Sequence, residues 1–147
     1  MRRTLLEVAA CLLAVGFFIH AAPLKIVVSQ PYLRLIPGGV PAAGYFNITN
    51  YASEPLVLVG AQSFDCGQIM MHKSTNIGGM SRMEDVHSLS IARGQRIAFA
   101  PGSYHLMCMH PSAALKVGGT ARIKLNFAGG ASSEITFYVV NARGLAQ

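Results

Sequence analysis

Methionine and histidine side chains gather in one part of this 147-residue sequence. Six of the seven methionines and four of the five histidines fall between residues 70 and 110. Methionines that only fill a core would be spread over all the strands, so this clustering indicates a chemical role. Thioether sulfur selects copper(I), and imidazole also binds copper. The clustered residues are Met70, Met71, His72, Met80, Met83, His87, His105, Met107, Met109 and His110.

Other metals suit this set of donors less well. Zinc prefers cysteine or a larger number of histidines, and calcium or magnesium prefers carboxylates, of which the chain has only six. A thioether has no proton to lose, so metal binding through methionine tolerates a lower pH than binding through a thiolate. Because thioether and neutral imidazole carry no charge, a bound Cu(I) ion keeps its own, and deep burial would be unfavourable. We therefore expect a shallow site.

Strand periodicity predicts which of these side chains point the same way. Residues two apart on a strand share a face. His105 and Met107 therefore project together, while Leu106 and Cys108 project to the other side. By the same rule Met70 shares a face with His72.

The spacing of four of these residues resembles the H-x10-M-x21-H-x-M motif of the periplasmic copper(I) chaperones of the PCuAC family. The sequence around Tyr45, the segment 101–107 and the segment 117–127 also resemble that family, and the likeness covers roughly residues 24–141. It implies a cupredoxin-like antiparallel β-sandwich or Greek-key barrel. It also implies that the protein delivers Cu(I) to the dinuclear copper centre of cytochrome c oxidase. The implied metal ligands are His72, Met83, His105 and Met107.

The chain departs from the family pattern in three places. Met70 and Met71 precede His72 where an acidic residue is common, and Cys108 follows Met107 where an apolar residue is usual. The chain also ends without the tail rich in histidine and methionine that some members carry. The second, copper(II) site that such a tail can form is therefore left open by the sequence.

The other clustered residues have two interpretations. Met80 and Met109 are either reserve thioethers or residues that fill gaps in the core, the usual task of methionine. Met70 and Met71 are expected to pack. His87 and His110 are expected to be surface or hydrogen-bonded histidines, with His110 close enough in sequence to join an entry path.

Two cysteines, Cys66 and Cys108, lie near the ligands, and a third, Cys11, lies in the N-terminal segment. In an exported protein we expect Cys66 and Cys108 to form a structural disulfide. The alternative is a reactive pair, which would make the protein a thiol–disulfide reductase for the copper-site cysteines of the oxidase. The chain has no C-x-x-C motif.

Short strands separated by turns account for the rest of the sequence. Glycine- and proline-containing turn signals recur at short intervals, and residues 122–127 alternate strictly between apolar and polar, as does the segment from Ile135 to Val139. Seven to nine strands of this kind predict an all-β sandwich or barrel. The expected strands cover residues 24–36, 42–50, 56–64, 68–73, 96–99, 104–110, 122–127 and 134–139.

The N-terminal residues resemble an export signal. Arg2 and Arg3 precede a short apolar stretch that ends in small residues, so residues 1–22 are predicted to be a cleaved signal peptide and residues 23–147 the copper-binding domain. This predicts a periplasmic location. A lipid-modified Cys11 and an uncleaved membrane anchor are the ranked alternatives.

The net charge of +6 is scattered rather than clustered, which disfavours nucleic acid as a partner. No nucleophile, paired carboxylates or catalytic triad has a recognisable spacing, so a binding protein is expected rather than an enzyme. The expected partner of the monomer is the copper-site subunit of the oxidase or another copper chaperone. A third possibility is an adhesive or structural sandwich that binds no metal.

Overall fold

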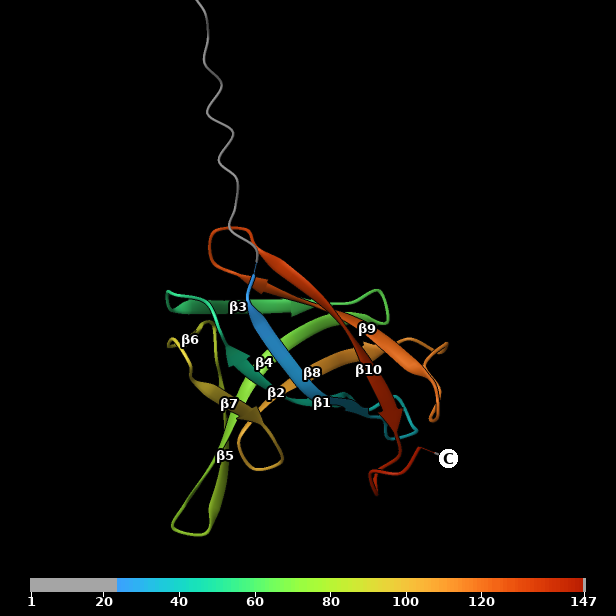
Figure 1. Cartoon of the computed structure of the whole chain (residues 1–147). Helices are drawn as coiled ribbons and strands as arrows, with labels where there is room; N and C mark the ends of the chain where they lie inside the picture. The colour runs from blue at the N-terminus through green and yellow to red at the C-terminus, as the bar shows by residue number, and fades with distance from the viewer. Residues whose placement is uncertain (1–23, 147) are drawn as a thin grey trace, which may run out of the picture.

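The computed structural model describes residues 24–146, and these form an all-β domain (Figure 1). The predicted signal peptide, residues 1–22, lies outside the described residues. Within residues 24–146 no helix has the length and apolar character needed to cross a membrane. The strands are β1 (Ile26–Arg34), β2 (Ala42–Asn50), β3 (Leu56–Gln62), β4 (Cys66–Ile77), β5 (Met80–Asp85), β6 (Leu89–Ile91), β7 (Arg96–Phe99), β8 (Tyr104–Pro111), β9 (Thr120–Phe127) and β10 (Ser132–Val140).

The prediction of an all-β fold is confirmed, but the described residues form ten strands rather than seven to nine. The two strands that the sequence did not reveal are β5 and β6. Every residue of β5 is exposed, so its sequence lacks the alternation that a half-buried strand produces. Strand β4 is also longer than expected, because it continues beyond residue 73 to the turn at Gly78 and Gly79.

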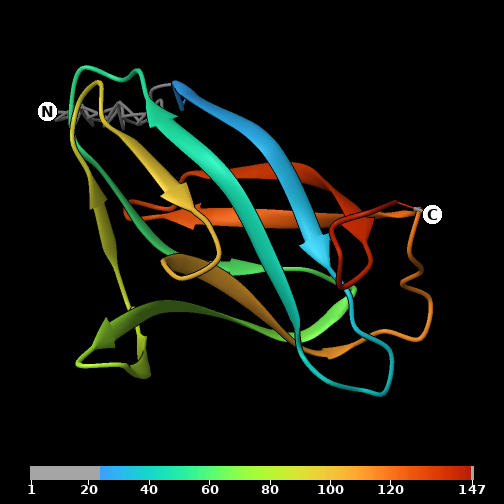
Figure 2. The same ribbon diagram turned by 90° about the horizontal axis from the view of Figure 1, so that it is seen from below.

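The strands join into one sheet in the order β5-β4-β8-β7-β2-β1-β10-β9-β3-β6, and β8 also pairs with β2. Most neighbouring strands are antiparallel, but β1 runs parallel to β10. Strand β7 also runs parallel to β8, where Phe99 is paired with Tyr104. The sheet curls into layers, as seen from below in Figure 2. Gly44 of β2 lies opposite Leu106, and a Cβ there would lie 3.2 Å from the Leu106 Cβ, so glycine permits β2 and β8 to approach closely.

The core lies inside the curled sheet. Phe46 stacks on Phe99 at a centroid distance of 4.3 Å and meets the edge of Phe137 at 5.6 Å. The predicted alternation holds in β9, where every second residue is buried. Burial of these apolar side chains is the main source of stability. The largest fully buried residues include Phe46, Phe137, Leu33, Ile48, Leu58, Ile91, Leu106, Ile123, Leu125 and Val139.

Strands β4 and β5 form a hairpin that projects from the rest of the domain (Figure 1). Its exposed apolar side chains are Ile77, Met80 and Met83. The hairpin is joined to the domain through the long pairing of β4 with β8, in which residues 66–73 face residues 104–111. This pairing places the first half of the predicted ligand set beside the second.

Candidate metal centre

The four predicted ligands lie on three neighbouring strands, β5, β4 and β8, and their registers place them on one face. His72 of β4 is paired with His105 of β8. Across the hairpin, His72 is paired with Asp85 and Met83 with Ser74. Side chains of directly paired residues, and of residues two apart, share one side of a sheet. We call this side, which carries His72, Met83, His105 and Met107, the ligand face.

His105 is fixed in one tautomer by its backbone neighbour. Its side chain is buried, with the residue only 4% exposed, and its Nδ1–H donates to the Ser103 carbonyl oxygen at 3.1 Å. The carbonyl can only accept, so Nε2 keeps its lone pair free. Burial lowers the pKa of His105, the Ser103 hydrogen bond raises it, and the nearby His72 and Arg34 lower it again. The net lowering favours the neutral ring, which is the form that binds metals.

His72 is held by a carboxylate. Its Nε2 donates to Oδ1 of Asp85 at 2.9 Å, and its ring meets the ring of His105 edge to face at a centroid distance of 5.6 Å. The other nitrogen, Nδ1, is buried and has no hydrogen-bond partner in the described part of the chain. A buried nitrogen without a partner is unfavourable, and a metal ion would satisfy its lone pair. A carboxylate that orients a metal-binding histidine is a common arrangement around metal sites.

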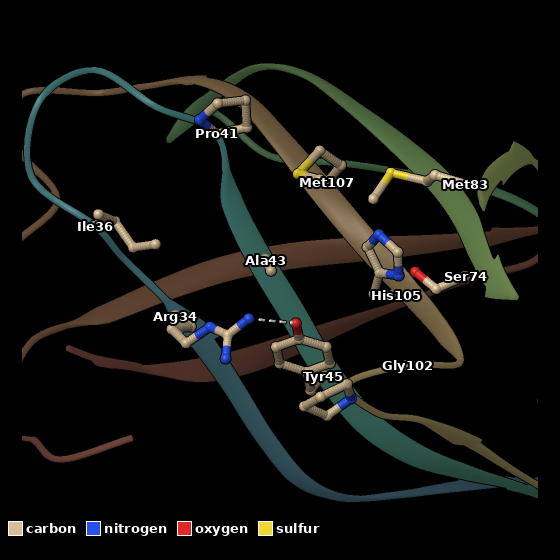
Figure 3. Close-up of a pocket in the computed structure, with 11 residues that line it drawn as sticks. Arg34, Ile36, Pro41, Ala43, Tyr45, Ser74, Met83, Gly102, His105 and Met107 are labelled. Carbon is tan, nitrogen blue, oxygen red and sulfur yellow. Dashed lines mark hydrogen bonds between the residues drawn. The ribbon is translucent and has the colours of Figure 1, made fainter. Parts of the chain in front are cut away.

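Met83, His105 and Met107 line one open pocket of about 320 Å³. Figure 3 shows the three side chains gathered on the same side of that pocket, with the two sulfur atoms beside the imidazole. Met83 is 54% exposed, whereas His105 is buried, so the pocket runs from the surface inward. His72 does not line this pocket but lies directly against His105. Three of the four predicted ligands, Met83, His105 and Met107, thus line one pocket, and the fourth, His72, lies against His105.

Sequence reasoning did not identify Arg34 and Tyr45 as pocket residues. Arg34 Nη2 donates to the Tyr45 hydroxyl at 2.9 Å, and its guanidinium lies 5.3 Å from the centre of the Tyr45 ring (Figure 3). Burial raises the pKa of Tyr45, although Arg34 acts to lower it. The ring of Tyr45 also lies 6.4 Å from that of His105. These residues come from β1 and β2, so only the pairing of distant strands reveals them.

The remaining methionines and histidines divide between the two faces. Met71 is buried in the core, as predicted, whereas Met70 lies on the ligand face and is only half-buried. Met80 is exposed, so it does not fill the core. His87 and His110 are exposed, which confirms their predicted surface positions. Within residues 24–146 no three His, Cys, Asp or Glu side chains are grouped so that they could hold a metal ion.

Cys66 and Cys108 form a disulfide, as expected, with an S–S distance of 2.02 Å. It joins β4 to β8, the two strands that carry His72 and His105. Both cysteines are buried. Thiol–disulfide exchange requires access of an attacking thiolate to a sulfur atom, so this burial disfavours the alternative of a thiol–disulfide reductase.

Comparison with known proteins gives a family match and a sequence relative, both of which are described as lipoproteins. Residues 26–139 match the family described as "Putative lipoprotein LpqE-like". The "Putative lipoprotein Lxx21020" of Leifsonia xyli subsp. xyli is 27% identical over 118 residues, which are 80% of this chain and 70% of that protein.

Two solved structures are also similar. The copper-bound PCuAC domain from PmoF2 is 25% identical and superimposes with a TM-score of 0.66, over 84% of this chain and 99% of that domain. The Deinococcus radiodurans protein CuI-DR1885, known from its solution structure, is 30% identical with a TM-score of 0.63, over 83% of this chain and 81% of that one.

The fold is therefore that of a PCuAC domain, as the sequence motif indicated. The chain belongs to the LpqE-like family.

Proposed function

We propose that this protein is an exported copper chaperone that binds one Cu(I) ion as its cargo through His72, Met83, His105 and Met107. The observation that carries the proposal is the gathering of Met83, His105 and Met107 around one pocket, with His72 against His105. The PCuAC domain from PmoF2 and the DR1885 protein are both known in a copper-bound form, which supports copper as the cargo here. The thioether donors are soft, which favours Cu(I), and imidazole also binds copper.

The graded exposure of the donors suits release by ligand exchange. Met83 lies on the exposed strand β5, so an incoming protein can replace it first. Met107 is half-buried and His105 is buried, so these donors would be replaced later. Since the bound ion keeps a positive charge, a site at the surface avoids the penalty of deep burial. Copper therefore passes between the two proteins without entering water as a free ion.

We further propose that the recipient is the dinuclear copper centre of cytochrome c oxidase, reached outside the cytoplasmic membrane. Residues 1–22 have the features of an export signal, and the names of the family and of a relative describe lipoproteins. We propose a periplasmic location after removal of residues 1–22. Lipid attachment at Cys11 is the competing outcome, and the mass of the mature protein distinguishes the two.

Anaerobic competition for Cu(I) against a chromophoric chelator tests copper binding. The wild type should take up one equivalent of Cu(I), and His72→Ala should lose most of this affinity while its circular dichroism spectrum stays unchanged. His87→Ala, which removes an exposed histidine that does not line the pocket, is the matched control and should bind like the wild type. The absence of Cu(I) binding by the wild type, or unaltered binding by folded His72→Ala, would overturn the proposal.

A transfer experiment tests the recipient. The Cu(I)-loaded protein is mixed with the soluble copper-site domain of an oxidase whose cysteines are reduced, and copper in each protein is measured after separation. We expect copper to move to the oxidase domain. If a small chelator removes the copper but the oxidase domain does not, the proposed recipient is wrong while the copper-binding role stands.

A further inference from the structure

Met70 lies where a further thioether ligand would be expected. It is paired directly with Met107 across the β4–β8 register, and it shares a face of β4 with His72. Two residues beyond Met107 on β8, Met109 lies on the same face, opposite Gln68. Three methionines therefore adjoin one another on the ligand face, beside the pocket that holds Met83.

These three methionines do not contribute to the core. Met70, Met107 and Met109 are all half-buried, and none of them packs against the hydrophobic core formed by the described residues. Met71, the sequence neighbour of Met70, is buried within that core. The usual role of methionine as a filler of core gaps therefore accounts for Met71 but not for the other three.

The pairing geometry permits shared binding of an ion. Directly opposed residues in an antiparallel pair have Cβ atoms about 4.5–5.5 Å apart, and diagonal neighbours remain within reach of long side chains. The methionine side chain rotates about three bonds, so the sulfur atoms of Met70 and Met107 can converge on one ion. Met109 can add a third thioether from the diagonal position.

We propose that Met70, Met107 and Met109 form a second copper(I) position that shares Met107 with the four-donor site, an inference that rests on the proposed function. The ion moves between the two positions by exchanging His72, His105 and Met83 for Met70 and Met109. Copper remains in the +1 state and no proton is released, because every donor in the exchange is neutral. Three thioethers without imidazole make the second position softer and weaker than the first.

The second position would allow the Cu(I) ion to leave the four-donor site at the end opposite the hairpin. Met83 lies on the hairpin that ends at Gly78 and Gly79, whereas Met109 faces Gln68 near the opposite end of β4. An ion held by Met70 and Met109 is thus displaced along β4 and β8, away from the hairpin. A partner that covers the hairpin would leave this second end open for loading or release.

Methyl NMR of protein with ¹³C-labelled methionine methyl groups tests the second position directly. Cu(I) is added anaerobically to the mature protein up to one equivalent. The Met70 and Met109 methyl signals should shift or broaden together with those of Met83 and Met107, while the Met71 signal stays in place. If only Met83 and Met107 respond, the second position is wrong and the proposed function stands. If no methionine signal responds, both proposals fail.

The kinetics of release provide the matched comparison. Met70→Leu and Met71→Leu keep nearly the same volume, so both should remain folded. Loss of the intermediate position should make release of Cu(I) to excess chelator several-fold slower in Met70→Leu, whereas Met71→Leu should release copper at the wild-type rate. An unchanged or faster release from folded Met70→Leu would contradict the inference.

Discussion

The two faces of the β4–β8 pair have opposite characters although they are made from the same short segments. On one face Met71, Leu106 and Cys108 are buried in the core. On the other face, the alternating residues His72 and His105 are paired beside each other, and His105 lines an open pocket. A step of one residue along the strand therefore separates a side chain that stabilises the fold from one that is available for chemistry.

By this division a small protein can present soft metal donors without weakening its core. Apolar burial and the disulfide act on the inner face, whereas the outer face carries neutral donors, and its methionines Met83 and Met107 lie outside the hydrophobic core of the described residues. Changes to the inner face should therefore alter stability strongly. Changes to the outer face should alter copper binding while the fold survives.

Removal of the disulfide should have the largest effect on stability. The two cysteines are 42 residues apart, and the entropy of closing such a loop corresponds to about 4 kcal/mol. The double variant Cys66→Ala with Cys108→Ala should lose stability of this order in urea denaturation. A double variant as stable as the wild type would show that the inner face does not depend on this bond.

Leu106→Ala should have the next largest effect. Leu106 is fully buried, and truncation of a buried leucine costs about 2–5 kcal/mol. Its neighbour Met107 provides the comparison, because Met107→Leu should change the stability by less than about 1.5 kcal/mol and yet weaken Cu(I) binding. Urea denaturation and chelator competition on both variants measure the two quantities. The comparison between the faces fails if Met107→Leu destabilises the protein as much as Leu106→Ala does.

Asp85→Ala tests the carboxylate that orients His72. Loss of a partner of this kind typically lowers metal affinity about 10- to 100-fold, because the His72 ring is no longer fixed with Nδ1 free. Glu84→Ala is the matched control, since Glu84 is paired with Lys73 and points to the other face of β5. Competition with a chelator should show the loss of Cu(I) affinity for Asp85→Ala alone. Equal Cu(I) affinities of the two variants would show that Asp85 does not orient His72 for copper binding.

The pH dependence of stability should show a smaller effect. Burial lowers the pKa of His105 in the folded protein, whereas the unfolded chain has the ordinary value of about 6.5. As the pH falls below that value, the unfolded chain binds the proton first, so the free energy of unfolding decreases. The contribution is complete above the ordinary pKa and is lost as the pH falls toward the folded pKa.

Urea titrations between pH 8 and pH 5 measure this decrease, with His105→Gln as the variant that lacks the titrating group. The wild type should lose more stability than His105→Gln over this range. A wild-type stability that rises relative to the variant as the pH falls would have the wrong sign.

The sequence predicted the fold class and part of the site because both depend on alternation along single strands. The shared face of His105 and Met107 and the alternating burial in β9 follow from a period of two. Strand β5 was missed because its side chains are all exposed, so no alternation remains to be seen. Alternation within one strand also places Met70 beside His72, which makes the expectation that Met70 packs like Met71 wrong.

The contacts between strands could not be predicted in the same way. The bond of His72 to Asp85 depends on the register set by the hairpin turn at Gly78 and Gly79. The pair formed by Arg34 and Tyr45 depends on the pairing of β1 with β2, and its place in the pocket depends on β2 lying next to β8. Such contacts are determined by how the sheet curls as a whole, and no local pattern of residues encodes that.

X-ray absorption spectroscopy of the Cu(I)-loaded protein tests whether methionine and histidine side chains hold the ion together. We expect a copper edge typical of the +1 state and a first shell that contains both methionine sulfur and histidine nitrogen. Met83→Leu with Met107→Leu should lose the sulfur contribution. A first shell of nitrogen and oxygen atoms only, with no sulfur in the wild type, would contradict the proposal that the outer face of β4, β5 and β8 is a thioether and imidazole site.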